Sequence, residues 1–231
     1  MMNKILNDAE WRQARLELLE EEKAFQQSRD ALARKRQALP WRKVDAEYEF
    51  DTEDGATSLA GLFGDASQMI VYHFMYQPNW DAGCKSCSFW ADSYDRSVEH
   101  LRARDVALVA VSRAPLDSLL GYRKRMGWGF PWVSSAANSF NYDFGVSFTP
   151  EQLDSGEVEY NYRMAAGRPE ELPGISVFAR DGDDVFHTYS TYSRGLDPYN
   201  ATYQLLDIVP KGRDEDGLQF TMEWLRRRDE Y

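Results

Sequence analysis

The chain has 231 residues, of which 43% are hydrophobic and 14% aromatic, and its formal net charge at pH 7 is -11. This length and apolar content are typical of a globular protein with a substantial core and argue against a disordered chain. The negative charge disfavours nucleic acid and anionic membrane as partners, because both require a basic surface. Its simplest explanation is solubility.

The sequence also predicts a cytoplasmic protein that does not cross a membrane. No apolar run approaches the ~18 residues of a membrane-spanning helix, and residues 1–22 lack the apolar centre of a signal peptide. The chain contains two cysteines, Cys84 and Cys87. A close pair in a reducing compartment is more often catalytic or metal-binding than structural.

Residues 8–38 predict one long helix, because they are rich in Glu, Arg, Gln, Ala and Leu and contain neither Gly nor Pro. Apolar side chains recur every seven residues, at Trp11, Leu18, Phe25, Leu32 and Leu39. The second apolar seam that a coiled coil requires is mostly polar here. We therefore expect a helical arm over residues 1–40 whose narrow stripe lies on its own protein or on a second subunit, which would make a homodimer.

Residues 41–63 predict a strand pair with a turn at Asp54-Gly55. Residues 67–76 form a nearly continuous apolar run with β-branched and aromatic side chains, which indicates a strand buried on both faces. The cysteine segment follows at once. Residues 86–105 are helical in composition, and residues 106–113 predict a second buried strand.

The remaining predicted elements follow in chain order: a helix over 115–128, an extended segment over 130–135, strands over 175–180 and 185–192 joined by a turn at 181–184, and a short helix over 198–210. Alternating strands and helices with a final hairpin predict an α/β domain over residues 41–231. The irregular region at about 134–172 is predicted to be an insertion that forms a lid or a substrate surface.

Cys84 and Cys87 lie where the first buried strand gives way to a helix. In an open α/β sheet, sites form beyond the carboxyl ends of the strands. The first turn of a helix has unpaired N–H groups and the positive end of the dipole, and both favour a thiolate; Lys85 adds a positive charge. We therefore predict that Cys84 is the nucleophile and that Cys87, one turn further along, is the resolving thiol.

Two other interpretations of the pair stay open. The same spacing serves zinc, but two more ligands would have to come from carboxylates or from His73, His100 and His187, which do not have the usual spacing of zinc ligands. In the second interpretation, both cysteines are core residues that take part in no chemistry. We expect neither a metal nor any other bound cofactor.

Four side chains near the pair are candidates for contacting a substrate. Trp80 offers a flat apolar surface or packs into the core, and Asp81 transfers protons or is simply solvated. Lys85 lies between the cysteines. Arg113 follows the second buried strand and is predicted to hold an anionic group, with a plain surface arginine as the alternative.

Pro173 is the last candidate. A proline directly before a buried strand either adopts a cis bond, which is usually a functional feature, or is an ordinary trans proline at a strand start. His73, within the buried strand, is expected to be a core residue.

Several aromatic-rich blocks resemble one bacterial family in the same order: "YHFMYQPNWDAGCKSCSFWAD", "YRKRMGWGFPWVSS" and "VFHTYSTYSRGLDPYN". The chain resembles, from its N-terminal helix to its last residues, the thioredoxin-like proteins catalogued as domain of unknown function eight-nine-nine. The resemblance implies a thioredoxin-like fold, with a central mixed sheet flanked by helices, and a dithiol–disulfide oxidoreductase. In such a fold a cis-proline faces the cysteine pair, and Pro173 stands in the corresponding place.

A looser resemblance, over residues 106–135, runs to peroxiredoxins. Those enzymes place a Thr or Ser three residues before the reactive cysteine, where this chain has Asp81, and their proline is out of register with Pro78. We expect a thiol–disulfide oxidoreductase that uses a protein or small-molecule disulfide and a reducing thiol system. A peroxiredoxin-like peroxidase and a non-catalytic binding module are the alternatives.

Overall fold

The structure is a computed structural model and describes residues 3–231. Its contacts divide the chain into two compact units, Met1–Pro40 and Trp41–Tyr231. No helix formed by residues 3–231 combines the length and the apolar character that spanning a membrane requires.

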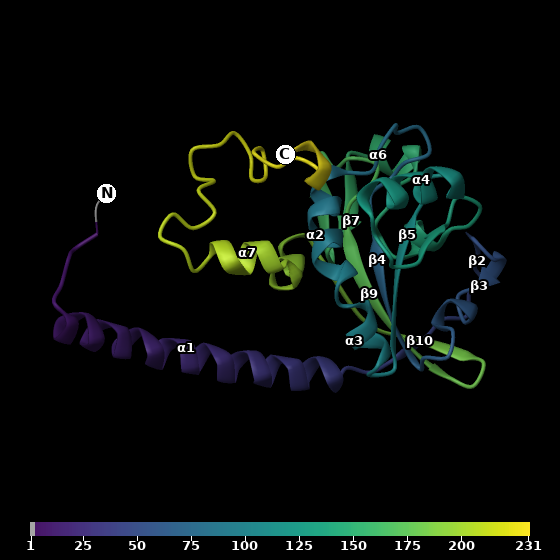
Figure 1. The fold of residues 1–231 in the computed structure, drawn as a ribbon. Helices are drawn as coiled ribbons and strands as arrows, with labels where there is room; N and C mark the ends of the chain where they lie inside the picture. The colour runs from purple at the N-terminus through teal and green to yellow at the C-terminus, as the bar shows by residue number, and fades with distance from the viewer. Residues whose placement is uncertain (1–2) are drawn as a thin grey trace. The chain divides into compact units, whose positions relative to one another are not determined.

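The first unit contains one long helix, α1 (Asp8–Gln37), drawn in purple in Figure 1. A capping box starts it: the Asn7 side chain accepts the N–H of Glu10, and the Glu10 carboxylate accepts the N–H of Asn7. Three basic residues in its last turn suit the negative end of the helix dipole. By itself α1 buries none of its residues, so the apolar stripe needs a surface to cover it.

The second unit contains all the strands and the other helices of the described chain. Its strands are β1 (Arg42–Lys43), β2 (Glu49–Thr52), β3 (Gly55–Ser58), β4 (Gln68–His73), β5 (Val106–Ser112), β6 (Trp132–Ser134), β7 (Glu157–Tyr160), β8 (Arg163–Ala166), β9 (Gly174–Asp181) and β10 (Asp184–Tyr192). Its α-helices are α2 (Lys85–Asp95), α3 (Val98–Arg102), α4 (Leu116–Met126), α5 (Phe140–Asp143), α6 (Pro150–Asp154) and α7 (Ala201–Leu206), and its 3-10 helices are η1 (Gly61–Phe63), η2 (Ser193–Tyr199) and η3 (Arg228–Glu230).

Within residues 3–231, eight strands form one sheet in the order β1-β10-β9-β4-β5-β6-β2-β3. Strands β4, β5 and β6 run parallel, whereas β9 is antiparallel to β4 and β10 is antiparallel to β9. A parallel βαβ unit beside an antiparallel hairpin, in the order β10-β9-β4-β5, confirms the predicted thioredoxin-like fold. The residues that follow β4 and β5 therefore meet at one edge of the sheet.

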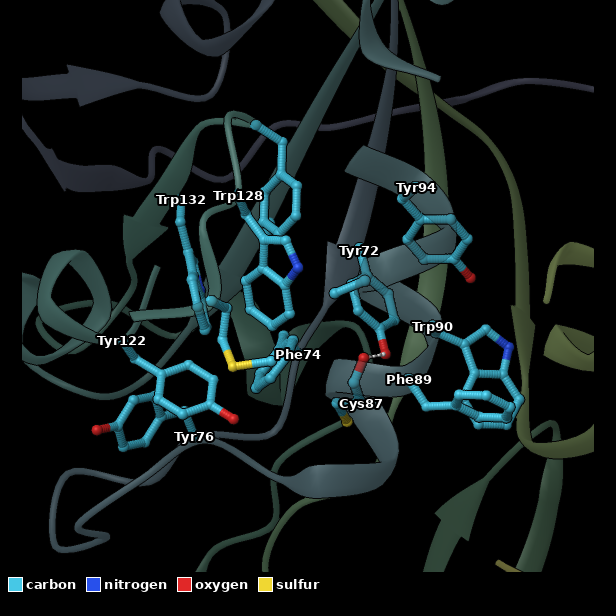
Figure 2. Close-up of a cluster of buried hydrophobic side chains, with 14 of the residues drawn as sticks. Tyr72, Phe74, Tyr76, Cys87, Phe89, Trp90, Tyr94, Tyr122, Trp128 and Trp132 are labelled. Carbon is cyan, nitrogen blue, oxygen red and sulfur yellow. Dashed lines mark hydrogen bonds between the residues drawn. The ribbon is translucent and has the colours of Figure 1, made fainter. Parts of the chain in front are cut away.

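Strict alternation along the central strands gives the sheet two buried faces. In β4, Val71 points into one core cluster and Tyr72 into the other. The cluster that contains Tyr72, called here the helix-side core, also contains side chains of α2 and α4, among them Trp90 and Tyr122. Figure 2 shows its aromatic side chains, with Cys87 among them. Burial on both faces explains why β4 and β5 are almost uniformly apolar.

Two sequence-based expectations were wrong in detail. Residues 86–105 form two helices, α2 and α3, rather than one. The break is stabilised by a tertiary contact, because the carboxylate of Asp95, at the end of α2, accepts the N–H of Gly129 at 2.6 Å. A contact between residues 34 positions apart cannot be predicted from the helical pattern of residues 86–105.

The region at about 134–172 is ordered rather than irregular. It contains α5, α6 and the β7–β8 hairpin, which is a separate two-stranded sheet. The hairpin turns at Asn161 and Tyr162, both with positive φ, as a tight two-residue turn requires. Buried aromatic and apolar residues hold the region to the body, including Phe140, Phe148 and Tyr160.

Candidate active site

The cysteine segment is anchored to the end of β4. After β4 the chain makes a turn and comes back, so that the N–H of Cys84 donates to the carbonyl oxygen of Met75 at 3.1 Å. Gly83 permits this return, because a Cβ at that position would lie 2.8 Å from the ring of Phe74 and 2.9 Å from the ring of Tyr122. The loop therefore packs directly on the helix-side core and delivers Cys84 to the start of α2.

Cys84 is the N-cap of α2, and its sulfur acts as the capping group. Its Sγ accepts the backbone N–H of Cys87 at 3.5 Å. Cys84 is half-buried, whereas Cys87 lies one turn further along and is 2% exposed. The Sγ of Cys87 accepts the N–H of Met75, also at 3.5 Å. Both thiols are free.

These contacts separate the acidities of the two thiols. The pKa of Cys84 falls from 9.0 to about 6, first because the Cys87 thiol donates to it, then because the backbone N–H groups of Cys87 and Ser86 donate to it and the Arg227 guanidinium lies near. Burial, and then the neighbouring Cys84, raise the pKa of Cys87 well above its usual value. Cys84 is therefore the thiolate at neutral pH, and Cys87 keeps its proton.

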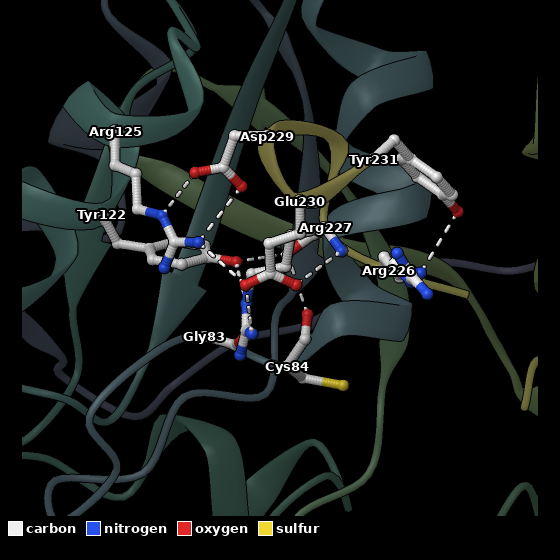
Figure 3. A network of polar contacts seen from close by, with 10 residues as sticks. Gly83, Cys84, Tyr122, Arg125, Arg226, Arg227, Asp229, Glu230 and Tyr231 are labelled. Carbon is white, nitrogen blue, oxygen red and sulfur yellow. Dashed lines mark hydrogen bonds and ion pairs between the residues drawn. The ribbon is translucent and has the colours of Figure 1, made fainter. Parts of the chain in front are cut away.

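The C-terminal segment, residues 213–231, contacts the loop that carries Gly83 and Cys84 (Figure 3). The Arg227 guanidinium donates to the carbonyl oxygen of Gly83 at 2.9 Å and to the Tyr122 hydroxyl at 2.8 Å. The Tyr122 hydroxyl shares a 2.9 Å hydrogen bond with Ser88 Oγ, which donates to the carbonyl oxygen of Cys84. Arg227 is held in turn by Glu230 at 3.1 Å. A polar network thus fixes the backbone on which Cys84 is mounted.

A buried carboxyl group, that of Glu171, lies near Cys84. Glu171 is 2% exposed, and one of its oxygens has no hydrogen-bond partner. Burial raises its pKa from 4.5 to about 7, although the Arg113 guanidinium and the N–H of Tyr76 act in the opposite direction. The negative charge of Cys84 adds to the rise. Glu171 is therefore a group that can change its protonation state near Cys84 at neutral pH.

Arg113 does follow the second parallel strand at its carboxyl end, as expected. Its guanidinium pairs with two carboxylates of the chain itself, at 2.9 Å from Glu170 and 3.6 Å from Glu171, and lies 4.7 Å from the ring centre of Tyr142. An anionic group of a substrate would have to compete with these carboxylates for Arg113.

The other predicted site residues lie around the pair. Trp80 is half-buried and packs against the helix-side core. Asp81 is exposed, and its charge adds to the burial that raises the pKa of Tyr76. Lys85 is the first residue of α2. Pro173 lines the same cavity as Cys87. The bond before Pro173 is trans, since no peptide bond within residues 3–231 is cis.

Two of the histidines proposed for the zinc alternative, His73 and His187, lie near each other and are joined through the hydroxyl groups of Ser176 and Ser190. His73 is buried in the core, where its Nε2 shares a 2.8 Å hydrogen bond with Ser176 Oγ, and His100 is exposed on α3. Among residues 3–231, no three side chains of His, Cys, Asp or Glu are grouped as a metal ion would require.

Three residues of the site were not predicted from the sequence. No sequence pattern around Tyr122 marks it as a site residue. For Glu171 the one indication is that it lies two residues before Pro173. Arg227 lies 144 positions from Gly83 and belongs to a basic stretch that resembles an ordinary solvated end. Only the packing of the C-terminal segment brings it to the cysteines.

Comparison with protein families gives one match over the whole chain. The family is described as "Bacterial protein of unknown function (DUF899)", and its model matches residues 1–231. No curated protein matches the chain.

Solved structures with a similar arrangement include peroxiredoxins. Peroxidoxin BcpB from Mycobacterium tuberculosis is 14% identical, with a TM-score of 0.48 over 72% of this chain and 97% of that chain. Peroxiredoxin Q from Xanthomonas campestris is 14% identical, with a TM-score of 0.49 over 73% and 97%. A hypothetical protein from Sinorhizobium meliloti is 15% identical, with a TM-score of 0.42 over 66% and 70%.

Proposed function

This chain belongs to the bacterial protein family of unknown function DUF899, and we propose that it is a thiol–disulfide oxidoreductase whose reactive pair is Cys84 and Cys87. The observation that carries the proposal is the asymmetry of the pair. Cys84 is half-buried and acidic, with donors from Cys87 on its sulfur, while Cys87 is buried and protonated. A partly exposed nucleophile beside a buried resolving thiol is what stepwise exchange requires.

The proposed reaction transfers two electrons from the two thiols to a substrate disulfide. The Cys84 thiolate attacks one sulfur of a substrate disulfide, RSSR', so that a Cys84–SR mixed disulfide forms and R'S⁻ leaves. Cys87 then loses its proton to solvent and attacks Cys84 Sγ, which releases RS⁻. The substrate gains two electrons and the protein ends as the Cys84–Cys87 disulfide. Residues three apart on one helix face are close enough to bridge with little backbone movement.

A second thiol system would return the protein to its dithiol form, and the reaction needs no bound cofactor. Such a system is available in the cytoplasm, the compartment that the sequence predicts. Trp80, Asp81, Lys85 and Arg113 stay proposed contacts of the substrate. Pro173, which lines the cavity beside Cys87, stays a proposed catalytic residue.

A redox titration tests the proposal. The purified full chain is equilibrated in dithiothreitol or glutathione buffers of graded potential, alkylated, and weighed by mass spectrometry. We expect one reversible two-electron transition between roughly -120 and -270 mV. Cys84→Ser and Cys87→Ser proteins should show no such transition.

Two results would reject exchange at this pair. One is that the thiols never join at any potential. The other is that both resist alkylation until the protein unfolds, which would favour a packed pair in a binding module. Steady turnover of hydrogen peroxide with a thiol donor, without reduction of any disulfide, would instead identify a peroxidase.

A further inference from the structure

A cavity of about 630 Å³ opens beside Cys87. Its volume is within the range of about 300–1,000 Å³ that small-molecule sites occupy. It lies between the first turn of α2, the end of β4, the segment before β9 and the C-terminal segment. Its apolar lining is Tyr72, Met75, Cys87, Trp90, Tyr160, Leu172, Pro173, Leu196, Tyr203 and Met222.

The polar atoms of the aromatic lining are already bonded inside the protein. The Tyr72 hydroxyl donates to the carbonyl oxygen of Cys87 at 3.1 Å, a bond drawn in Figure 2. Trp90 Nε1 donates to the carbonyl oxygen of Leu196 at 2.9 Å, and the Tyr160 hydroxyl donates to that of Pro173 at 2.7 Å. These side chains therefore offer apolar ring surface to an occupant rather than unmet donors.

The charges at the cavity are largely neutralised by one another. Arg213 pairs with Asp197 at 3.0 Å and with Asp207 at 2.7 Å. Glu215 accepts hydrogen bonds from the Tyr203 hydroxyl, the N–H of Met222 and the indole of Trp224. Arg168 and Asp216, of opposite sign, are exposed at the rim. Inside the cavity a charged ligand would lose hydration where the charged side chains are already paired, whereas a neutral ligand loses little.

The C-terminal segment makes one wall of the cavity. Leu225 is 3% exposed, and the ring of Trp224 packs edge-on against that of Phe89 at 5.7 Å, so the segment is fixed to α2. Thr221 and Met222 then face the cavity. The space that these walls leave has the size of a small molecule.

We propose that this cavity binds small, neutral, apolar disulfides, aromatic ones above all, and that these are the substrates of the Cys84–Cys87 pair. The inference rests on the proposed exchange reaction and names its substrate class. Cys84 is not part of the lining, but its Sγ accepts the N–H of Cys87, which is. An aromatic group of the disulfide occupies the cavity beside Cys87, so that its sulfur lies within reach of Cys84, which attacks it. One aromatic thiolate leaves at that step, and the second leaves when Cys87 closes the protein disulfide, so two electrons pass to the substrate.

The test compares two neutral disulfides, 2,2'-dithiodipyridine and bis(2-hydroxyethyl) disulfide, by stopped-flow reaction with the reduced protein. Each rate constant is divided by that of the same disulfide with free glutathione, which removes its intrinsic reactivity. We expect the corrected ratio to favour the aromatic disulfide by about tenfold or more, the effect of burying one ring. The corrected rate constants of oxidised glutathione and insulin, measured in the same way, should be lower than those of both neutral disulfides.

Two matched variants locate the effect. Thr221→Trp fills the cavity from an exposed position, and Gln219→Trp puts the same side chain on the same segment outside the cavity. The preference for the aromatic disulfide should disappear in the first and persist in the second. Equal preference in wild type and Thr221→Trp overturns the proposal.

Equilibrium dialysis separates binding from exchange. A Cys84→Ser, Cys87→Ser protein cannot react with 2,2'-dithiodipyridine, so any retention measures occupancy. We expect saturable binding of one molecule per chain that Thr221→Trp abolishes. Exchange at intrinsic rates without this binding rejects the cavity and leaves the proposed function standing. Binding without exchange of any disulfide rejects the proposed function and the substrate role with it.

Discussion

Arg227, four residues before the last residue of the chain, donates a 2.9 Å hydrogen bond to the carbonyl oxygen of Gly83, the residue before Cys84. The two residues are 144 positions apart. The contact makes the C-terminal segment part of the cysteine site in two ways. It holds the loop that carries Cys84, and it adds a positive charge that lowers the pKa of Cys84.

Replacing this guanidinium should weaken the acidity of Cys84. In Arg227→Gln we expect the pKa of Cys84 to rise by less than about one unit, because the donors from Cys87 and Ser86 remain. The rate of alkylation by iodoacetamide, followed from pH 4 to pH 9, measures it. Arg226→Gln, an exposed neighbour, is the control. An equal rise in both variants would mean that overall charge, not the contact, is responsible.

Removing the Cys87 thiol should raise the pKa of Cys84 more than removing the Arg227 guanidinium, because donation from Cys87 is the largest cause of the lowered pKa. We expect Cys87→Ala to raise the pKa of Cys84 further than Cys87→Ser, since a hydroxyl still donates and a methyl group does not. The same alkylation profile decides this. Identical midpoints in the two variants would show that the thiol of Cys87 does not support the thiolate.

Glu171 should make stability depend on pH above the acid range. A carboxyl whose pKa is raised on folding stabilises the fold below its unfolded pKa, and this contribution is lost as pH rises through the folded value. For Glu171 the window runs from 4.5 to about 7, which corresponds to about 3 kcal/mol at about 1.4 kcal/mol per unit. Glu171→Gln, which mimics the protonated form, should therefore gain stability over wild type at pH 8 but not at pH 4.

Urea unfolding at the two pH values measures this difference. Glu170→Gln, at the adjacent and more exposed carboxylate, is the matched control. The same gain in the control would contradict the assignment. Glu171→Gln should also lower the pKa of Cys84, because the two negative charges oppose each other and the coupling is reciprocal.

His73 should act in the opposite sense. Burial lowers its pKa from 6.5 to about 3. Between these pH values His73 is therefore protonated in the unfolded chain but neutral in the folded chain. The free energy of unfolding therefore falls as pH drops from 6.5 towards 3. His73→Phe should lose about 2 kcal/mol less than wild type between pH 7 and pH 5. His100→Gln is the exposed control, and parallel losses in His73→Phe and wild type would reject the prediction.

The apolar stripe of α1 is proposed to join two copies of the chain. In the double variant Leu18→Gln, Phe25→Gln we expect sedimentation equilibrium to report a monomer where the wild type is a dimer. Glu21→Gln, Ser28→Ala, on the more polar seam, is the control. A wild-type monomer at micromolar concentration would show instead that the stripe does not join copies.

Much of the fold could be predicted from local pattern. The helix α1 has a good composition and clear caps, and β4 and β5 are apolar on both faces because helices and loops cover both sides of the sheet. The order of strands and helices limited the connection between β4 and β5 to a parallel crossover. The position of Cys84 at a helix start could be predicted from its place after β4. The roles of nucleophile and resolving thiol stay proposals that rest on this position.

The sequence by itself determined the main elements of the central sheet, their order and the position of the cysteines, since these depend on neighbours along the chain. It did not determine the break between α2 and α3 or the β7–β8 hairpin. The tertiary structure alone decided what surrounds the pair. Arg227, Glu171 and the cavity beside Cys87 reach the site through packing between distant segments, and no periodicity records such contacts. Acidity depends on burial and on charges a few ångströms away in space, so the ionisation of Cys84 and Glu171 belongs to the fold rather than to the motif.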